Sequence, residues 1–124
     1  MSTTKLDNTY CSYKFAHETD LGTATVQNVT SGSATVYSIQ ANNVANTSTA
    51  SYLKLYDTLP DGGIVTASTE PDYIFQLDGG KDVILSWPAG LFISTGLSIR
   101  CVADPQTNNV ADPGQNVVVT VLYS

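Results

Sequence analysis

Histidine and cysteine, on which many catalytic and zinc sites depend, are nearly absent from this sequence. His17 is the only histidine, and Cys11 and Cys101 are the only cysteines. A Ser-His-Asp or Cys-His site would have to use His17, and zinc needs three or four ligands from histidine, cysteine and carboxylate groups. We therefore expect no enzyme, no bound metal and no cofactor.

Glutamate is also rare, since Glu18 and Glu70 are the only two among eleven acidic residues. Several aspartates lie beside glycine or proline, where aspartate is common for backbone reasons. A glycosidase needs two opposed carboxylates, which this distribution does not favour. Calcium bound by loop carboxylates is a minor alternative, because no Asp-x-Asp-x-Asp spacing is present.

Positive charge is sparse, and the formal net charge is −6. Nucleic acids and anionic lipids draw their affinity from clustered lysine and arginine. The cations of this chain are scattered, so we expect neither partner. Only 13% of the residues are charged, and a surface rich in Thr, Asn and Tyr suits a protein interface better. The cations are Lys5, Lys14, Lys54, Lys81 and Arg100.

Long apolar runs are missing as well. No stretch approaches the length that crosses a bilayer, and no basic segment followed by an apolar one indicates a signal peptide. Without an export signal, we favour two reduced, buried thiols for Cys11 and Cys101 over a disulfide between them. At 124 residues the chain is expected to form one domain with a core of its own.

What the sequence does contain is a series of short alternating segments separated by Gly, Pro, Asn and Asp. In residues 34–42, for example, Tyr37, Ile39 and Ala41 share one face and Gln40 lies on the other. Seven to eight such segments, without a convincing helical period, predict an all-β antiparallel sandwich, for which jelly-roll connections are one arrangement. The expected strands are Leu21–Val29, Ala34–Asn42, Thr49–Asp57, Asp72–Leu77, Lys81–Trp87, a strand from Leu97 through Cys101, and Gln115–Tyr123. The last of these is apolar on both faces, which indicates a strand covered on both sides.

The densest apolar stretch is Trp87–Arg100, and it contains its own breaks. Pro88 and Gly90 interrupt the run that enters it, and Gly96 precedes the alternating run that leaves it. Proline cannot donate to a sheet ladder, and glycine adopts backbone angles that other residues avoid. We therefore predict a strand that reaches a corner, a short apolar crossing and a second strand.

Two groups of aromatic residues are candidates for a contact surface. Residues 1–20 show no clear period, so they form either an edge strand through Cys11, Tyr13 and Phe15 or an extended arm that orders on a partner. In the strand 49–57, tyrosine and lysine alternate with leucine and would face outward, although ordinary cross-strand packing is the competing interpretation. The candidate interface residues are Tyr10, Tyr13, Phe15, Tyr52, Lys54 and Tyr56.

Four motifs follow one another along residues 34–124. They are Tyr-Leu-Lys-Leu-Tyr-Asp at 52–57, Glu-Pro at 70–71, Pro-Ala-Gly-Leu-Phe-Ile-Ser-Thr-Gly-Leu at 88–97, and Val-Val-Val-Thr-Val-Leu-Tyr at 117–123. In this order they resemble small virion structural proteins of tailed bacteriophages. The sequence departs from that pattern at Ile93, which separates Phe92 from the Ser-Thr-Gly turn.

The resemblance implies a non-enzymatic β-sandwich that is assembled in the cytoplasm of the bacterial host and becomes part of the virion. The first expectation is a capsid cement or decoration protein on the outer surface of the head, which clamps neighbouring subunits of the major capsid protein lattice. Residues 34–124 would be the sandwich core, and residues 1–33, with the first strand, the capsid-binding arm. Because sandwich edges must be paired, covered or blunted, we expect a homodimer or homotrimer.

Two alternatives stay open. Within the same class, the chain would be a head–tail connector or a tail structural component. From a different class, a carbohydrate-binding β-sandwich module would use exposed aromatic residues as stacking platforms, with Tyr52, Tyr56 and Trp87 as candidates. Of these, Trp87 lies beside the proline of the predicted corner and fits better in the core.

Overall fold

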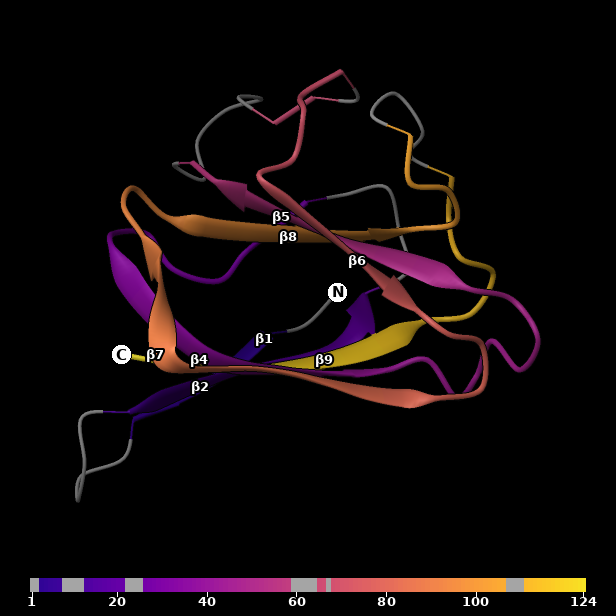
Figure 1. Cartoon of the computed structure of the whole chain (residues 1–124), viewed down its shortest axis with the longest axis horizontal. Helices are drawn as coiled ribbons and strands as arrows, with labels where there is room; N and C mark the ends of the chain where they lie inside the picture. The colour runs from indigo at the N-terminus through magenta and orange to yellow at the C-terminus, as the bar shows by residue number, and fades with distance from the viewer. Residues whose placement is uncertain (1–2, 8–12, 22–25, 59–64, 67, 107–110) are drawn as a thin grey trace.

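The computed structural model describes residues 3–7, 13–21, 26–58, 65–66, 68–106 and 111–124. Within this part of the chain the regular elements are β-strands, and they form two antiparallel sheets packed face to face (Figure 1). The predicted all-β antiparallel sandwich is therefore confirmed. The five-stranded sheet has the order β1 (Thr3–Asp7), β2 (Lys14–Leu21), β9 (Val117–Tyr123), β4 (Ala34–Asn42), β7 (Asp82–Ile93). The four-stranded sheet has the order β3 (Gln27–Asn28), β8 (Leu97–Val102), β5 (Ser51–Asp57), β6 (Tyr73–Leu77).

From β2 onward the strands pair in a jelly-roll scheme. β2 pairs with β9, β3 with β8, β4 with β7 and β5 with β6, as in one long hairpin that has been rolled up. Successive pairs of this hairpin fall alternately in the larger and the smaller sheet. A double-sheet jelly roll has eight strands, which β2–β9 supply, and β1 extends the larger sheet at its edge.

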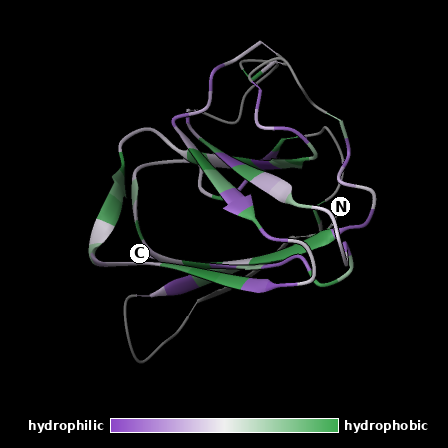
Figure 2. Ribbon diagram, turned by 45° about the vertical axis from the view of Figure 1, so that its right-hand side comes forward, coloured by the Kyte–Doolittle hydropathy of each residue, from purple (hydrophilic) through white to green (hydrophobic). Residues whose placement is uncertain are grey.

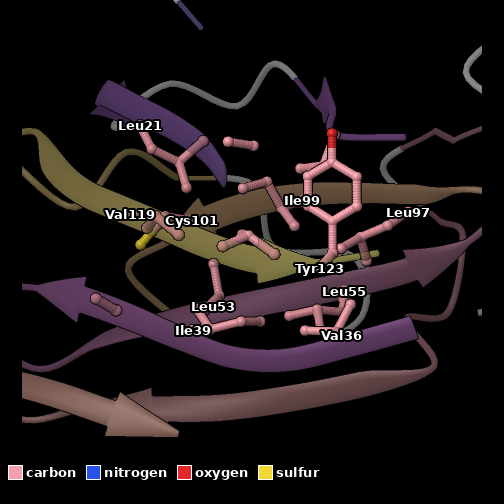
Figure 3. Packing of buried hydrophobic residues seen from close by; sticks show 14 of the residues in the cluster. Leu21, Val36, Ile39, Leu53, Leu55, Leu97, Ile99, Cys101, Val119 and Tyr123 are labelled. Atoms are coloured by element: carbon pink, nitrogen blue, oxygen red, sulfur yellow. The ribbon is translucent and has the colours of Figure 1, made fainter. Parts of the chain in front are cut away.

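The core lies between the two sheets and follows the period-2 alternation of the strands. On β9, for example, Val117, Val119 and Val121 are buried, and the residues between them are half-buried. Figure 3 shows Ile39 and Leu53 meeting from opposite sheets within this core. The prediction that β9 is covered on both sides is therefore wrong for the described part of the chain, because the other side of β9 faces away from the second sheet and its residues are only half-buried.

The break predicted at Pro88 and Gly90 is a β-bulge within one strand. β7 continues through both residues, and its register against β4 shifts at residues 36–38. β7 is the last strand of its sheet, and edge strands and bulges are the places where sheets tolerate proline. Gly90 has a φ of +87°, and a Cβ atom there would collide with Cγ2 of Thr35. The chain therefore turns later than predicted, at residues 94–96.

The first third of the chain differs from the predictions in two respects. Lys14–Leu21 forms β2, which lies between β1 and β9 with Ala16 and Leu21 fully buried. For Lys14–Leu21 the predicted strand is correct and the extended arm is not. The strand lies inside the sheet, however, and not at its edge as predicted. The single strand predicted from Leu21 to Val29 is divided, because Leu21 ends β2 in one sheet and Gln27–Asn28 forms β3 in the other.

One end of the sandwich is held together by two buried asparagines, Asn43 and Asn46. The Nδ2 group of Asn43 donates hydrogen bonds to the backbone carbonyls of Leu77 (3.1 Å) and Asp78 (3.3 Å). Asn46 Nδ2 donates to Asn43 Oδ1 at 2.8 Å, and its amide exchanges two further bonds with the backbone of Gln115, at 3.0 and 2.9 Å. These side chains join the β4–β5, β6–β7 and β8–β9 connections.

The two outer faces of the sandwich differ in cover. Loops that follow β5 and β8 lie over the outer face of the four-stranded sheet, whereas the described residues place no comparable layer over the five-stranded sheet (Figure 1). In Figure 2 these loops are largely hydrophilic or neutral, and hydrophobic residues are concentrated in the strands. This asymmetry decides which surface is available to a partner.

Candidate interaction surface

The uncovered outer side of the five-stranded sheet presents a regular array of side chains, which we call the bare face. Its residues alternate along each strand with the buried residues of the core. Cross-strand register places them in rows that run from β2 through β9 and β4 to β7. One row is Phe15, Leu122, Ser38 and Ser86, the next is His17, Thr120, Gln40 and Ile84, and Thr35 and Phe92 are paired beyond the bulge.

Large apolar side chains on the bare face are exposed to solvent. Phe92 and Ile84 are each 66% exposed, and Tyr13 and Phe15 are also exposed. Tyr13 contacts the ring of Tyr37 edge-on, with 5.1 Å between the ring centroids. Exposed apolar side chains that gather on one face of a sheet are typical of surfaces that bind a protein partner.

The position of Tyr37 corrects a prediction. The sequence pattern placed Tyr37 on the core side together with Ile39 and Ala41, and only the latter two are buried. The bulge at residues 36–38 interrupts the alternation, so Tyr37 is half-buried beside Tyr13. The bulge thereby adds an aromatic ring to the exposed apolar patch.

The centre of the bare face is poor in charge. Among the described residues of β2, β9, β4 and β7, the rows defined above contain no Asp, Glu, Lys or Arg. Their polar groups bond within the face: the Nδ1 atom of His17 lies 2.8 Å from Thr120 Oγ1, and Gln40 Nε2 donates to the Asp82 carboxylate at 2.9 Å. Depletion of charge together with aromatic enrichment is the composition found at the centres of protein interfaces.

Three predicted interface residues belong to the N-terminal region. Tyr13 and Phe15 lie on the bare face, at the β2 side of the sheet. Tyr10 lies outside the described residues, as does Cys11. Both described residues are exposed, and they lie on the same face of the sheet as Ile84 and Phe92 of β7.

The other three predicted interface residues are on β5, and their predicted exposure is wrong for two of them. Tyr52, Lys54 and Tyr56 do point away from the core, as the alternation with leucine indicates. However, Lys54 is 0% and Tyr56 is 1% exposed, and Tyr52 is half-buried. The loops over this sheet cover them, so β5 does not offer the expected contact surface.

Sequence reasoning missed Ile84 and Phe92, the two most exposed large apolar residues of the described chain. A signal for Ile84 was available in the run Val83-Ile84-Leu85, where an apolar residue interrupts the polar positions of an alternating strand. Phe92 carried no such signal, because its outward direction depends on where the bulge at Gly90 shifts the alternation.

The described residues do not assemble a group of three or more His, Cys, Asp and Glu side chains that could hold a metal ion. Cys101 is buried and free, and burial raises the pKa of its thiol to about 12. None of the described residues belongs to a helix long and apolar enough to cross a membrane. The bare face is therefore the feature of the described chain that best fits a function.

Comparison with known proteins adds no relative. No protein-family model matches the chain, and neither a curated protein nor a solved structure is significantly similar to it.

Proposed function

We propose that this chain is a non-enzymatic structural protein of a tailed-phage virion, most specifically a capsid cement or decoration protein. It sits on the outer surface of the head, contacts the major capsid protein lattice and clamps neighbouring subunits. In this role it acts through buried area alone, without a metal, a cofactor or a chemical step.

The observation that carries the proposal is the bare face. It combines exposed Phe92, Ile84, Tyr13 and Phe15 with central rows that contain no charged residue. The described loops lie over the outer face of the opposite sheet (Figure 1), whose exposed large apolar residues are Tyr73 and Ile74 at its β6 edge, each less exposed than Phe92 and Ile84. A face that combines exposed apolar side chains with uncharged polar ones suits a protein that lies against a larger lattice.

Two further observations support the phage assignment. The motifs at 52–57, 70–71, 88–97 and 117–123 resemble those of small virion proteins. The jelly-roll topology is one that viral capsid proteins use, although lectins and other domains use it too. The fold is compatible with the proposal, and the order of the motifs and the composition of the bare face support it.

The alternative of a sugar-binding module is less favoured. Of its three stacking candidates, Tyr56 is buried and Tyr52 is half-buried. Trp87 packs edge-on against Phe75 at 5.7 Å between ring centroids and contacts the core. A head–tail connector or tail component would use the same bare face, so the particle that binds the protein distinguishes these roles.

The test is co-sedimentation with heads of the encoding phage that lack this protein. Full-length chain is compared with a Phe92→Ser, Ile84→Ser double variant and with Ile74→Ser, which alters an exposed apolar residue on the other sheet. We expect wild type and Ile74→Ser to bind, and the double variant to lose binding by roughly 10- to 100-fold. Truncation at Gly32 is not a useful test, because it removes β2 and its buried residues.

Other outcomes separate the alternatives. Binding to tails but not to heads would favour the connector or tail role, and a glycan-dependent change in tryptophan fluorescence without particle binding would favour a sugar-binding module. Equal binding by all variants would show that the bare face is not the docking surface. Sedimentation velocity at tens of micromolar tests the expected homodimer or homotrimer, which a monodisperse monomer would contradict.

A further inference from the structure

The outer face of the four-stranded sheet contains two cations side by side in the interior. Lys54 on β5 and Arg100 on β8 are cross-strand neighbours, and they are 0% and 4% exposed. Tyr56 and Ser98, the next cross-strand pair on the same face, are each 1% exposed. Four polar side chains are therefore enclosed between this sheet and the loops above it.

Two side chains of this group, Arg100 and Tyr56, have hydrogen-bond donors without a partner among the described residues. Lys54 Nζ donates to the backbone carbonyl of Gln106 at 2.7 Å. The Arg100 guanidinium lies 5.7 Å from the centroid of the Tyr56 ring, a cation–π contact that leaves its N–H groups available. Within the part of the chain that the structure describes, Arg100 Nε, Arg100 Nη1 and the Tyr56 hydroxyl are buried and have no hydrogen-bond partner.

Asp104, the acid that acts on Lys54, does not bond to Nε or Nη1 of Arg100, which have no partner among the described residues. Asp104 acts on Lys54 electrostatically, opposing the decrease in the lysine pKa that burial and Arg100 cause. One carboxylate oxygen of Asp104 accepts a hydrogen bond from the backbone N–H of Gln106, at 2.9 Å. A buried guanidinium with unused donors beside a second cation is costly unless an anion balances it. The site therefore has the chemistry of an anion receptor.

We propose that this group binds one small oxyanion of the phosphate or sulfate type. Arg100 and the Tyr56 hydroxyl provide the directed donors, and Lys54 provides a second positive charge. The ligand must be compact, because the three side chains are almost fully enclosed and leave no room for a macromolecular segment. Gln106, whose carbonyl accepts the hydrogen bond from Lys54, is itself exposed to solvent. This site is independent of the bare face and of the proposed function.

The experiment is a titration of the full-length protein with phosphate at constant ionic strength, read by thermal unfolding and by calorimetry. We expect a saturable rise in Tm, on the order of 10 °C when phosphate exceeds its Kd by a hundredfold, and one phosphate bound per chain. Phosphate and sulfate also raise Tm without saturation by exclusion from the protein surface. Variants separate the two effects.

Arg100→Gln should abolish the saturable rise in Tm with phosphate and keep the unsaturable rise. Lys81→Gln, which changes an exposed lysine, should keep both. Tyr56→Phe removes one donor and should weaken binding several-fold, which also serves if Arg100→Gln does not fold. An unsaturable response that is equal in wild type and Arg100→Gln, or no bound phosphate by calorimetry, would overturn the proposal.

Discussion

The side chain of Asp57 is bound to the backbone of Thr95, with 2.8 Å between Asp57 Oδ1 and the Thr95 nitrogen. The same carboxylate accepts bonds from the backbone N–H of Ser94 (2.9 Å) and Gly96 (3.3 Å), and from the Ser94 hydroxyl at 3.0 Å. Asp57 is the last residue of β5, and residues 94–96 connect β7 to β8. One carboxylate thus fixes the turn that carries the chain from the larger sheet to the smaller one.

Asp57→Asn should destabilise the fold by about 1–3 kcal/mol. The amide removes the negative charge and directs N–H groups toward backbone donors that then lack an acceptor. The measurement is urea unfolding at pH 7, with Asp112→Asn at an exposed position as the matched control. A control that loses as much stability as Asp57→Asn would show that the turn does not depend on this carboxylate.

The same contact makes stability depend on pH. Burial of Asp57 opposes its ionisation, but the hydrogen bonds from Ser94, Thr95 and Gly96 outweigh this effect and hold its pKa below the usual value. A depressed pKa gives a contribution that is complete above the unfolded value, near 4, and is lost as the pH falls through the folded pKa. We expect the free energy of unfolding to fall below about pH 4, and to fall less steeply in Asp57→Asn. Parallel curves for the two proteins would contradict this.

Asn43 should be the most sensitive polar residue at the opposite end of the sandwich. Asn43→Ala leaves the carbonyls of Leu77 and Asp78 and the Asn46 amide without their buried partner. We expect a loss of roughly 2–4 kcal/mol, because several buried groups lose hydrogen bonds at once. Asn116→Ala, at an exposed position, should change stability by less than about 0.5 kcal/mol. Similar losses of Tm in the two variants would contradict the role of the buried network.

Local periodicity was sufficient to predict most of the fold. The strand Ala34–Asn42 was predicted with the bounds that the structure has, and the alternation of Leu53 and Leu55 correctly identified the core side of β5. The topology was left open between sandwich arrangements. Alternation depends on the pleat of a single strand, so it can be read from neighbouring residues without knowledge of the partner strand.

What the sequence did not reveal depends on contacts between distant segments. Pro88 and Gly90 predict an interruption of the strand. That this interruption is a bulge within an edge strand follows only from the pairing with β4. Lys54 faces away from the core as predicted, and its burial comes from a loop about fifty residues further along the chain, where Gln106 accepts its hydrogen bond. The bare face depends on the same kind of information, since the exposure of Phe92 follows from the bulge in β7 and from the described loops, which lie over the other sheet (Figure 1).

Two glycines provide a matched test of packing at the loops. A Cβ atom on Gly79 would lie 2.5 Å from the backbone nitrogen of Thr49 and 2.8 Å from the carbonyl carbon of Ser48, whereas one on Gly32 would meet nothing within 4 Å. Gly79→Ala should therefore cost about 1–3 kcal/mol, because backbone has to move. Gly32→Ala should be neutral or stabilise by up to about 1 kcal/mol through the unfolded state. Equal effects on Tm would mean that the β6–β7 connection is not packed against residues 48–49.

Cys101 should be unreactive while the protein is folded. Its side chain is fully buried, and that burial raises the pKa of the thiol to about 12, so only about one molecule in ten thousand carries a thiolate at pH 8. In a Cys11→Ser background, a thiol reagent such as Ellman's reagent should label Cys101 only as fast as the chain unfolds, and completely in denaturant. Cys101→Val, which keeps a small apolar side chain, should abolish labelling with a stability change below about 1.5 kcal/mol. Full labelling of Cys101 within minutes in native buffer would contradict its place between the sheets.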